Sequence, residues 1–225
     1  MGSMIQFQRH TSTYDGYLAP ASSGRGPGVI VLQEWWGLVP HIKAIADRFA
    51  AARFTALAPD LYGGQTAAGP DDAGRLMMAL EIGETEKVLR GAVEALLVHP
   101  ACGSPRVGVV GFCMGGQLAL LAGTLNPKVG AVVDFYGIHP KVAPDYTKLQ
   151  APVLGIFAEK DGFVNAAAVA GLEQALKAAG KRITIRWFKG VDHAFFNDTR
   201  PDVYHEASAR EAWDLTVDFL EESLR

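Results

Sequence analysis

Short runs of β-branched and apolar residues recur along the chain, separated by longer segments in which apolar residues return every three or four positions. A continuous apolar run is typical of a strand buried on both faces, whereas the longer spacing is typical of an amphipathic helix. The pattern therefore predicts alternating strands and helices. The predicted strands are 29–32, 55–58, 107–110, 129–135, 153–157 and 183–188, and the predicted helices are 42–49, 71–80, 84–98, 118–122, 166–179 and 206–224.

The first twenty residues have a different pattern. Residues 5–13 alternate loosely between apolar and polar side chains, and residues 16–20 follow a Tyr-Asp-Gly sequence that favours a turn. We expect an antiparallel hairpin here, with its turn at residues 14–16. Residues 1–3 resemble a cloning remnant ahead of a native start at Met4.

Alternation of strands with helices favours a mostly parallel sheet with helices on both faces, so the expected fold class is α/β. A chain of 225 residues with 49% hydrophobic content is long enough for one substantial core. We expect residues 1–225 to form a single domain.

Composition narrows the classes of partner. The net charge of −3 gives no electrostatic basis for binding nucleic acid or an anionic membrane surface, and no apolar run is long enough to span a membrane. The N-terminus lacks a basic segment followed by an apolar one, so no secretory signal is visible. The two cysteines, Cys102 and Cys113, do not make a disulfide framework, so we expect a cytoplasmic protein. We expect it to be a monomer or a small homo-oligomer. No cofactor or metal is expected; the histidines without metal-ligand spacing are His41, His99, His139 and His205.

Residues 108–116 contain the most informative motif. A short apolar strand is followed by Gly-x-Cys-x-Gly around Cys113 and then by a helical segment, which is the nucleophile-elbow pattern with a thiol at its apex. Gly111 and Gly115 would let strand and helix approach closely around a strained apex residue. The alternative is that Cys113 is a small buried hydrophobic residue, as free cysteines often are; Cys102 is interpreted in that way.

Four chemically active side chains, Glu34, Cys113, Asp161 and His193, each follow the end of a predicted strand. Because the carboxyl ends of parallel strands share one edge of a sheet, we expect them to meet there. A thiol nucleophile needs a base to take its proton and a carboxylate to orient that base. The chain order of nucleophile, acid and base matches that of α/β-hydrolases.

Each of these residues also has a structural interpretation. His193 could cap a helix or lie in the core, Asp161 could simply form an Asp-Gly turn, and Glu34 could be a solvated surface charge. Asp192, next to the histidine, is the less favoured acid. Their joint placement in one chain order favours catalysis.

The chain resembles the dienelactone hydrolase (carboxymethylenebutenolidase) family over nearly its whole length. The resemblance implies an α/β-hydrolase fold and a Cys113–His193–Asp161 triad acting on esters and lactones. It also implies that Glu34 contacts the resting thiol, and that the backbone N–H groups of Met114 and Trp35 form the oxyanion hole. The motifs that carry it are Gln33-Glu34-Trp35-Trp36-Gly37, Gly111-Phe112-Cys113-Met114-Gly115-Gly116, Lys160-Asp161-Gly162-Phe163-Val164 and Asp192-His193-Ala194-Phe195-Phe196.

The resemblance is weaker at the substrate-binding positions. Founding members of the family hold a substrate carboxylate with two arginines, one of them four positions after the histidine, where this chain has Asn197. The position after the histidine, often serine in the family, is Ala194. The candidates for contacting substrate here are Trp36, Phe195, Arg75 and Arg200.

Three functions remain open on this reasoning. The first is a cysteine hydrolase of lactones or esters that proceeds through a thioester. The second is a generalist carboxylesterase or thioesterase on the same scaffold. The third, a nucleotide-binding module without catalysis, is disfavoured because the glycines do not form Gly-x-Gly-x-x-Gly. The expected partner in the first two cases is a small-molecule lactone or ester.

Overall fold

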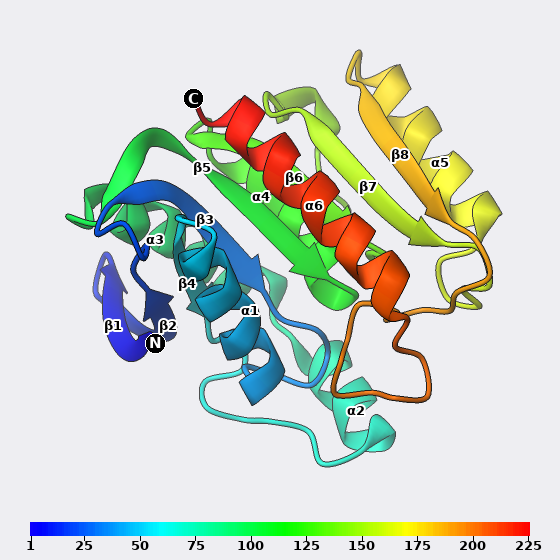
Figure 1. Cartoon of the computed structure of the whole chain (residues 1–225), viewed down its shortest axis with the longest axis horizontal. Helices are drawn as coiled ribbons and strands as arrows, with labels where there is room; N and C mark the ends of the chain where they lie inside the picture. Colours follow the sequence, from blue (N-terminus) through cyan, green and yellow to red (C-terminus); the bar gives the residue numbers. More distant parts are fainter.

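A computed structural model describes residues 1–225. Eight strands form one sheet in the order β1-β2-β4-β3-β5-β6-β7-β8 (Figure 1). Strands β3 to β8 run parallel, whereas β1 pairs with β2 and β2 with β4 in antiparallel fashion. The strands are β1 (Ser3–Arg9), β2 (Ser12–Ala19), β3 (Gly26–Leu32), β4 (Thr55–Pro59), β5 (Cys102–Phe112), β6 (Val129–Phe135), β7 (Val153–Ala158) and β8 (Ile183–Phe188).

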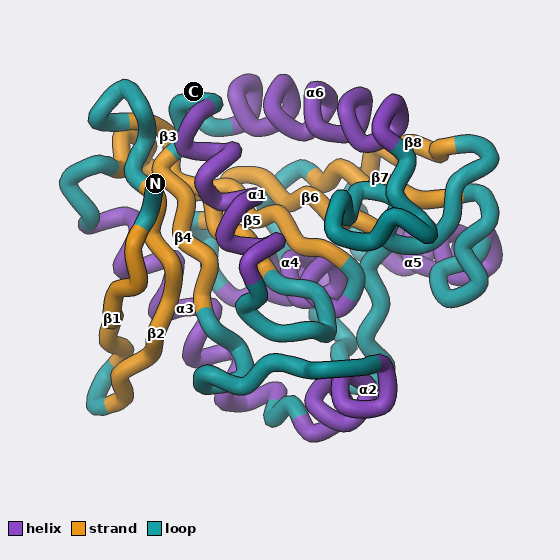
Figure 2. Tube along the Cα trace, turned by 60° about the horizontal axis from the view of Figure 1, so that its bottom comes forward, coloured by secondary structure: helices purple, strands orange, loops and turns teal.

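Five of the six α-helices cover the two faces of the sheet. Helices α1 and α6 lie on one face, and α3, α4 and α5 lie on the other (Figure 2). The helices are α1 (Pro40–Ala51), α2 (Pro70–Ala79), α3 (Ile82–Val98), α4 (Met114–Leu125), α5 (Ala166–Ala178) and α6 (Glu206–Ser223), with a short 3₁₀ turn η1 (Tyr146–Lys148). The α/β architecture predicted from the alternation of patterns is confirmed. None of the helices is both long and apolar enough to cross a membrane.

The sheet divides the interior into two apolar cores. The core beneath α1 and α6 contains Cys113, and the core beneath α3 and α4 contains Met114. Consecutive residues at the end of β5 are therefore packed in opposite layers of the molecule.

The predicted hairpin forms, but its turn lies elsewhere. Strand β2 runs straight through Tyr14-Asp15-Gly16, and the chain reverses at His10, whose φ of 52° supplies the left-handed turn conformation. Gly16 is instead needed for close packing, because a Cβ there would lie 3.1 Å from Ala58 O. Ser3, which the sequence assigned to a remnant, pairs with Leu18 in this hairpin.

Several elements start earlier than the pattern predicts. Helix α2, for example, begins at Pro70 after Gly69, so Asp71 and Asp72 lie within its first turn, where acidic residues interact favourably with the helix dipole. Strand β5 begins at Cys102, several residues before the apolar run, and Cys102 is buried.

Candidate active site

Cys113 lies between the end of β5 and the first residue of α4. Its backbone has φ 54° and ψ −120°, a strained conformation for a residue with a side chain. The turn closes tightly, since a Cβ on Gly111 would lie 1.8 Å from Gly115 O and one on Gly115 would lie 2.5 Å from Gln33 O. Glycine at both positions lets the strand and the helix meet, and the thiol stands at the positive end of α4.

Asp161 and His193 form a short, oriented hydrogen-bonded pair. The distance from His193 Nδ1 to Asp161 Oδ2 is 2.6 Å. The other carboxylate oxygen accepts from the backbone N–H groups of Phe163 at 2.7 Å and Val164 at 2.8 Å. Burial alone would raise the pKa of Asp161, but the hydrogen bond and charge of His193, together with these N–H donors, lower it. Asp161 is therefore an ionised, fixed acceptor.

His193 lies between this carboxylate and the thiol. Burial alone would lower its pKa, but the hydrogen bonds and negative charges of Asp161 and Cys113 raise the pKa to about 10. Because Nδ1 is engaged by Asp161, Nε2 is the nitrogen available to Cys113. The imidazole ring packs against Tyr136, with centroids 4.8 Å apart, and against Phe163 at 5.3 Å.

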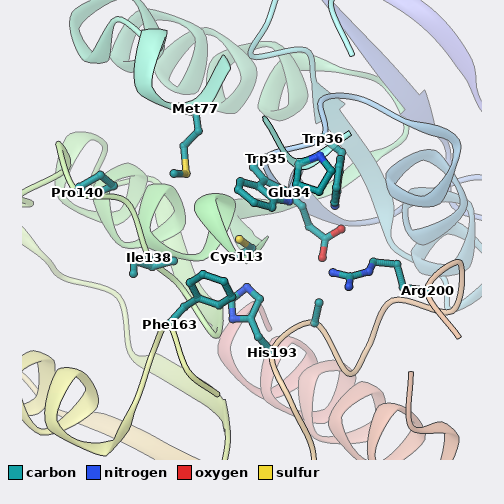
Figure 3. Close-up of a pocket in the computed structure, with 12 residues that line it drawn as sticks. Glu34, Trp35, Trp36, Met77, Cys113, Ile138, Pro140, Phe163, His193 and Arg200 are labelled. Carbon is teal, nitrogen blue, oxygen red and sulfur yellow. The ribbon is translucent and has the colours of Figure 1, made fainter. Parts of the chain in front are cut away.

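These side chains open onto a cavity of about 640 Å³ (Figure 3). Of the predicted site residues, Glu34, Trp35, Trp36, Cys113, His193 and Arg200 line it. Most of its wall is apolar or aromatic. The remaining lining residues, which sequence reasoning did not select, are Pro70, Met77, Ile138, Pro140, Phe163 and Ala194. Two of them come from α2, which closes one side of the cavity.

Two of the four residues predicted to contact substrate lie away from this cavity. Phe195 is fully buried and packs against Tyr136 and Phe188. Arg75 lies on the outer surface of α2, where it pairs with Asp72 at 3.0 Å. Helical geometry explains the second case, because Met77 and Arg75 are two residues apart and project from different sides of α2.

Glu34 is buried at the wall of the cavity. The family resemblance implies that it contacts the resting thiol, but its carboxylate forms no hydrogen bond with Cys113. Its Oε2 accepts a 2.7 Å hydrogen bond from Asn197 Nδ2. Burial raises the pKa of Glu34, and this effect is opposed by the charge of His41, the Asn197 hydrogen bond and the charges of His193 and Arg200. Asn197, a residue absent from the predicted site, is thus the direct partner of Glu34.

Two backbone N–H groups near the thiol have no partner within the fold. Met114 is the first residue of α4, so its N–H lies outside the intrahelical hydrogen-bond ladder. Trp35, in the loop after β3, donates to no backbone carbonyl. Unpaired N–H groups that lie beside a nucleophile can stabilise a developing oxyanion.

Arg200 supplies the one guanidinium at the cavity wall. Its side chain is 34% exposed and its Nη2 pairs with Asp202 at 2.6 Å, which partly neutralises its charge. No group of three or more His, Cys, Asp or Glu side chains is arranged to hold a metal ion.

Comparison with known proteins identifies the family of the chain. The sequence model of the Dienelactone hydrolase family matches residues 14–224. "Protein usf" of Aquifex pyrophilus is 39% identical over 100% of both chains, and the "Putative carboxymethylenebutenolidase" of Aquifex aeolicus (strain VF5) is 37% identical over 100% of both. A crystal structure described as a "Putative Dienelactone Hydrolase" from Klebsiella pneumoniae is 27% identical, with a TM-score of 0.88 over 98% of each chain.

Proposed function

Because the chain belongs to the dienelactone hydrolase family and is accordingly a hydrolase of esters or lactones, we propose that it cleaves them with Cys113 as nucleophile, through a thioester intermediate. The observation that carries the proposal is the connected arrangement of thiol, imidazole and carboxylate at the cavity wall. Asp161 holds His193 at 2.6 Å, and the hydrogen bond and charge of Cys113 contribute to the raised pKa of that imidazole. A neutral thiol beside a neutral imidazole would be a much weaker nucleophile.

Acylation follows from this arrangement. His193 Nε2 holds the thiol proton as an imidazolium, and the thiolate attacks the carbonyl carbon while the carbonyl electrons move to oxygen. The resulting oxyanion accepts from the N–H groups of Met114 and Trp35, each worth about 3–4 kcal/mol in the transition state. Collapse breaks the bond to the leaving oxygen, which takes the proton from His193.

Deacylation uses the same groups in reverse roles. His193 removes a proton from a water molecule, whose oxygen attacks the thioester carbon, and the thiolate leaves with its electron pair. Asp161 stays ionised throughout, holding the ring in one tautomer and stabilising the imidazolium. A thiolate departs readily from a tetrahedral intermediate, so substrates with good leaving groups such as enol or aryl esters suit this nucleophile.

The substrate class is set by the cavity wall. Aromatic and aliphatic side chains dominate it, with Arg200 as the single arginine or lysine and its guanidinium already paired with Asp202. This lining supports small, largely apolar lactones or esters. A generalist carboxylesterase is the second candidate, favoured by the same apolar lining and by the absence of an arginine at position 197.

The test is alkylation of the thiol combined with cysteine variants. Hydrolysis of a 4-nitrophenyl ester and of an unsaturated, carboxylate-bearing lactone should be abolished by iodoacetamide and by Cys113→Ala. Cys102→Ala is the matched control, because Cys102 is equally buried but lies at the start of β5, and it should retain full activity. Mass spectrometry of quenched reactions should find the acyl group on Cys113.

The relative rates assign the substrate class. Turnover of the lactone places the activity with carboxylate-bearing lactones, whereas turnover of the aryl ester alone supports the generalist esterase. Full activity in Cys113→Ala would overturn the proposed nucleophile.

A further inference from the structure

The orientation of the Asn197 side-chain amide is fixed by its neighbours. Asn197 is 2% exposed, and its Oδ1 accepts from Thr199 N at 3.0 Å and from Thr199 Oγ1 at 2.7 Å. A backbone N–H can only donate, so the atom facing Thr199 must be the oxygen. The amide nitrogen therefore faces Glu34 and donates to Oε2.

This constraint distinguishes the two oxygens of Glu34. Oε2 accepts from Asn197, whereas Oε1 forms no hydrogen bond within the protein. The fully buried side-chain oxygens without a partner belong to Tyr14, Asp134 and Tyr136, and Glu34 Oε1 is not among them. Figure 3 shows the carboxyl group pointing into the space between Cys113, His193 and Arg200. In the acid form we place the proton on Oε1, the oxygen that has no donor from the protein and is open to the cavity.

We propose that Asn197 positions Glu34 so that a protonated Oε1 donates a hydrogen bond to an acceptor oxygen in the acyl part of the bound substrate. The inference rests on the proposed function and deepens it, since it names a polar group of the substrate, an acceptor oxygen, that the otherwise apolar cavity would recognise. Glu34 then acts as a binding residue with a donor hydrogen, and Asn197 as its positioning residue.

The surroundings of Glu34 are consistent with the acid form. Burial raises its pKa more than the charges of His41, His193 and Arg200 and the Asn197 hydrogen bond lower it, and Arg200 forms no ion pair with it but is bonded to Asp202. The other titratable groups that face it are His41 from α1, Tyr136 after β6, and Cys113 and His193 at the reaction centre. Asp198 Oδ1 accepts a 3.1 Å hydrogen bond from His41 Nδ1 at the edge of the same network.

Glutamine at position 34 mimics the acid form. Its oxygen can accept from Asn197 while its NH₂ faces the cavity as a permanent donor. The probes are 4-nitrophenyl methoxyacetate, whose ether oxygen is an added acceptor, and 4-nitrophenyl butyrate, in which a CH₂ replaces that oxygen. Glu34→Ala should lower kcat/KM for the methoxyacetate about tenfold more than for the butyrate, mainly through KM. Glu34→Gln should restore most of the difference.

A second readout is the pH dependence of the variant relative to wild type. Dividing kcat/KM of Glu34→Gln by that of the wild type cancels the titrations of the triad that both proteins share. The ratio should rise with pH as Glu34 in the wild type loses its proton. Asn197→Ala should lower kcat/KM severalfold in the wild type and have no further effect in Glu34→Ala. Arg75→Ala, on the outer face of α2, is the matched control and should have no effect.

The outcomes separate the inference from the proposed function. Glu34→Gln as impaired as Glu34→Ala on both esters, with a pH-independent ratio, would overturn the inference, because the carboxylate itself would then be required. If Cys113→Ala is inactive in the same assay, the proposed function stands regardless. Thermal unfolding of each variant identifies any that fail to fold. For those, the wild-type preference for the methoxyacetate over the butyrate decides, measured over the whole pH range in which the protein stays folded: a preference that does not fall with rising pH contradicts the inference.

Discussion

The carboxylate of Asp161 lies 2.6 Å from His193 Nδ1 and is held from its other side by two backbone N–H groups, those of Phe163 and Val164. Both oxygens of the carboxylate therefore accept hydrogen bonds from the protein, one from the backbone and the other from the imidazole. This explains how a side chain on a loop can hold the imidazole in a single orientation.

Replacement of Asp161 by asparagine should lower kcat by about 10²- to 10⁴-fold, because an amide cannot accept from both the backbone and the imidazole. Either the NH₂ group meets two backbone N–H donors, or it faces Nδ1 and forces the wrong tautomer. Steady-state kinetics measure the loss. Asp192→Asn is the control, since Asp192 is exposed and adjacent to the histidine, and it should stay within about twofold of wild type. A large loss in Asp192→Asn with a small one in Asp161→Asn would reverse the assignment of the acid.

Alanine at Gly111 should destabilise the protein by more than about 3 kcal/mol, because its Cβ would overlap the carbonyl of Gly115 at 1.8 Å. Gly74→Ala is the contrasting substitution. It lies inside α2 with nothing within 4 Å of the added atom, so it should increase the free energy of unfolding by about 0.5–1 kcal/mol. Urea midpoints at constant m-value measure both. Equal effects of the two substitutions would contradict the proposed role of close packing at the elbow.

Stability should depend on pH through His193 in a defined direction. Its pKa is about 10 in the folded protein, above the value of about 6.5 for an unfolded histidine. The folded state therefore holds the proton more tightly, and the resulting stabilisation is complete below about pH 6.5 and is lost as the pH rises through about 10. The free energy of unfolding of the wild type minus that of His193→Gln should fall between pH 7 and 10, by at most about 1.4 kcal/mol per pH unit. A difference that is constant over this range would contradict the assignment.

Asp161 should act in the opposite direction. Its pKa is lowered in the folded protein, so its contribution to stability is present above the unfolded value of about 3.9 and is lost as the pH falls below that value. Comparison of wild type with Asp161→Asn between pH 3 and 6 should show the advantage of the wild type shrinking toward acid pH. A stability difference between wild type and Asp161→Asn that increased toward acid pH would contradict the lowered pKa of Asp161.

Arg200→Ala should affect charged substrates more than neutral ones. Arg200 is the only arginine on the cavity wall, so its removal should lower kcat/KM for a carboxylate-bearing ester about tenfold relative to a neutral ester of the same length. The partial neutralisation by Asp202 keeps the expected effect modest. Arg210→Ala, on α6, serves as the control. Equal relative efficiencies in the wild type and Arg200→Ala would exclude a carboxylate-binding role for Arg200.

Much of the architecture could be predicted because the signals are local. Strands β6 and β8 have the bounds that the apolar runs and the alternation indicate, and Cys113, Asp161 and His193 converge because parallel strands end at one edge of the sheet. The turn of the first hairpin could not be located in this way. Gly16 has the composition of a turn residue, but its glycine is required by contact with β4, a strand forty residues away in sequence.

The cavity wall was harder to predict for a related reason. Met77 and Ile138 come from segments remote from every motif, and their inward orientation depends on how α2 and the loop after β6 pack. Arg75 shares α2 with Met77 but faces solvent, so proximity in sequence misled the assignment. The sequence does contain an indication that Asn197 is a buried polar residue. It is a polar residue shortly after Phe195 and Phe196, where burial was to be expected, and a buried amide requires specific partners.

Cys113 and Met114 are anchored in different cores, although one peptide bond joins them. The spacing between the Cys113 thiol and the Met114 N–H therefore depends on the packing of both cores. If Cys113 is the nucleophile as proposed, we expect substitutions that repack either core to alter catalysis, even where they lie far from the substrate. Met77 of α2 lines the cavity and also packs against the core that holds Met114, so a substitution there that changes the substrate range would be felt at the elbow as well.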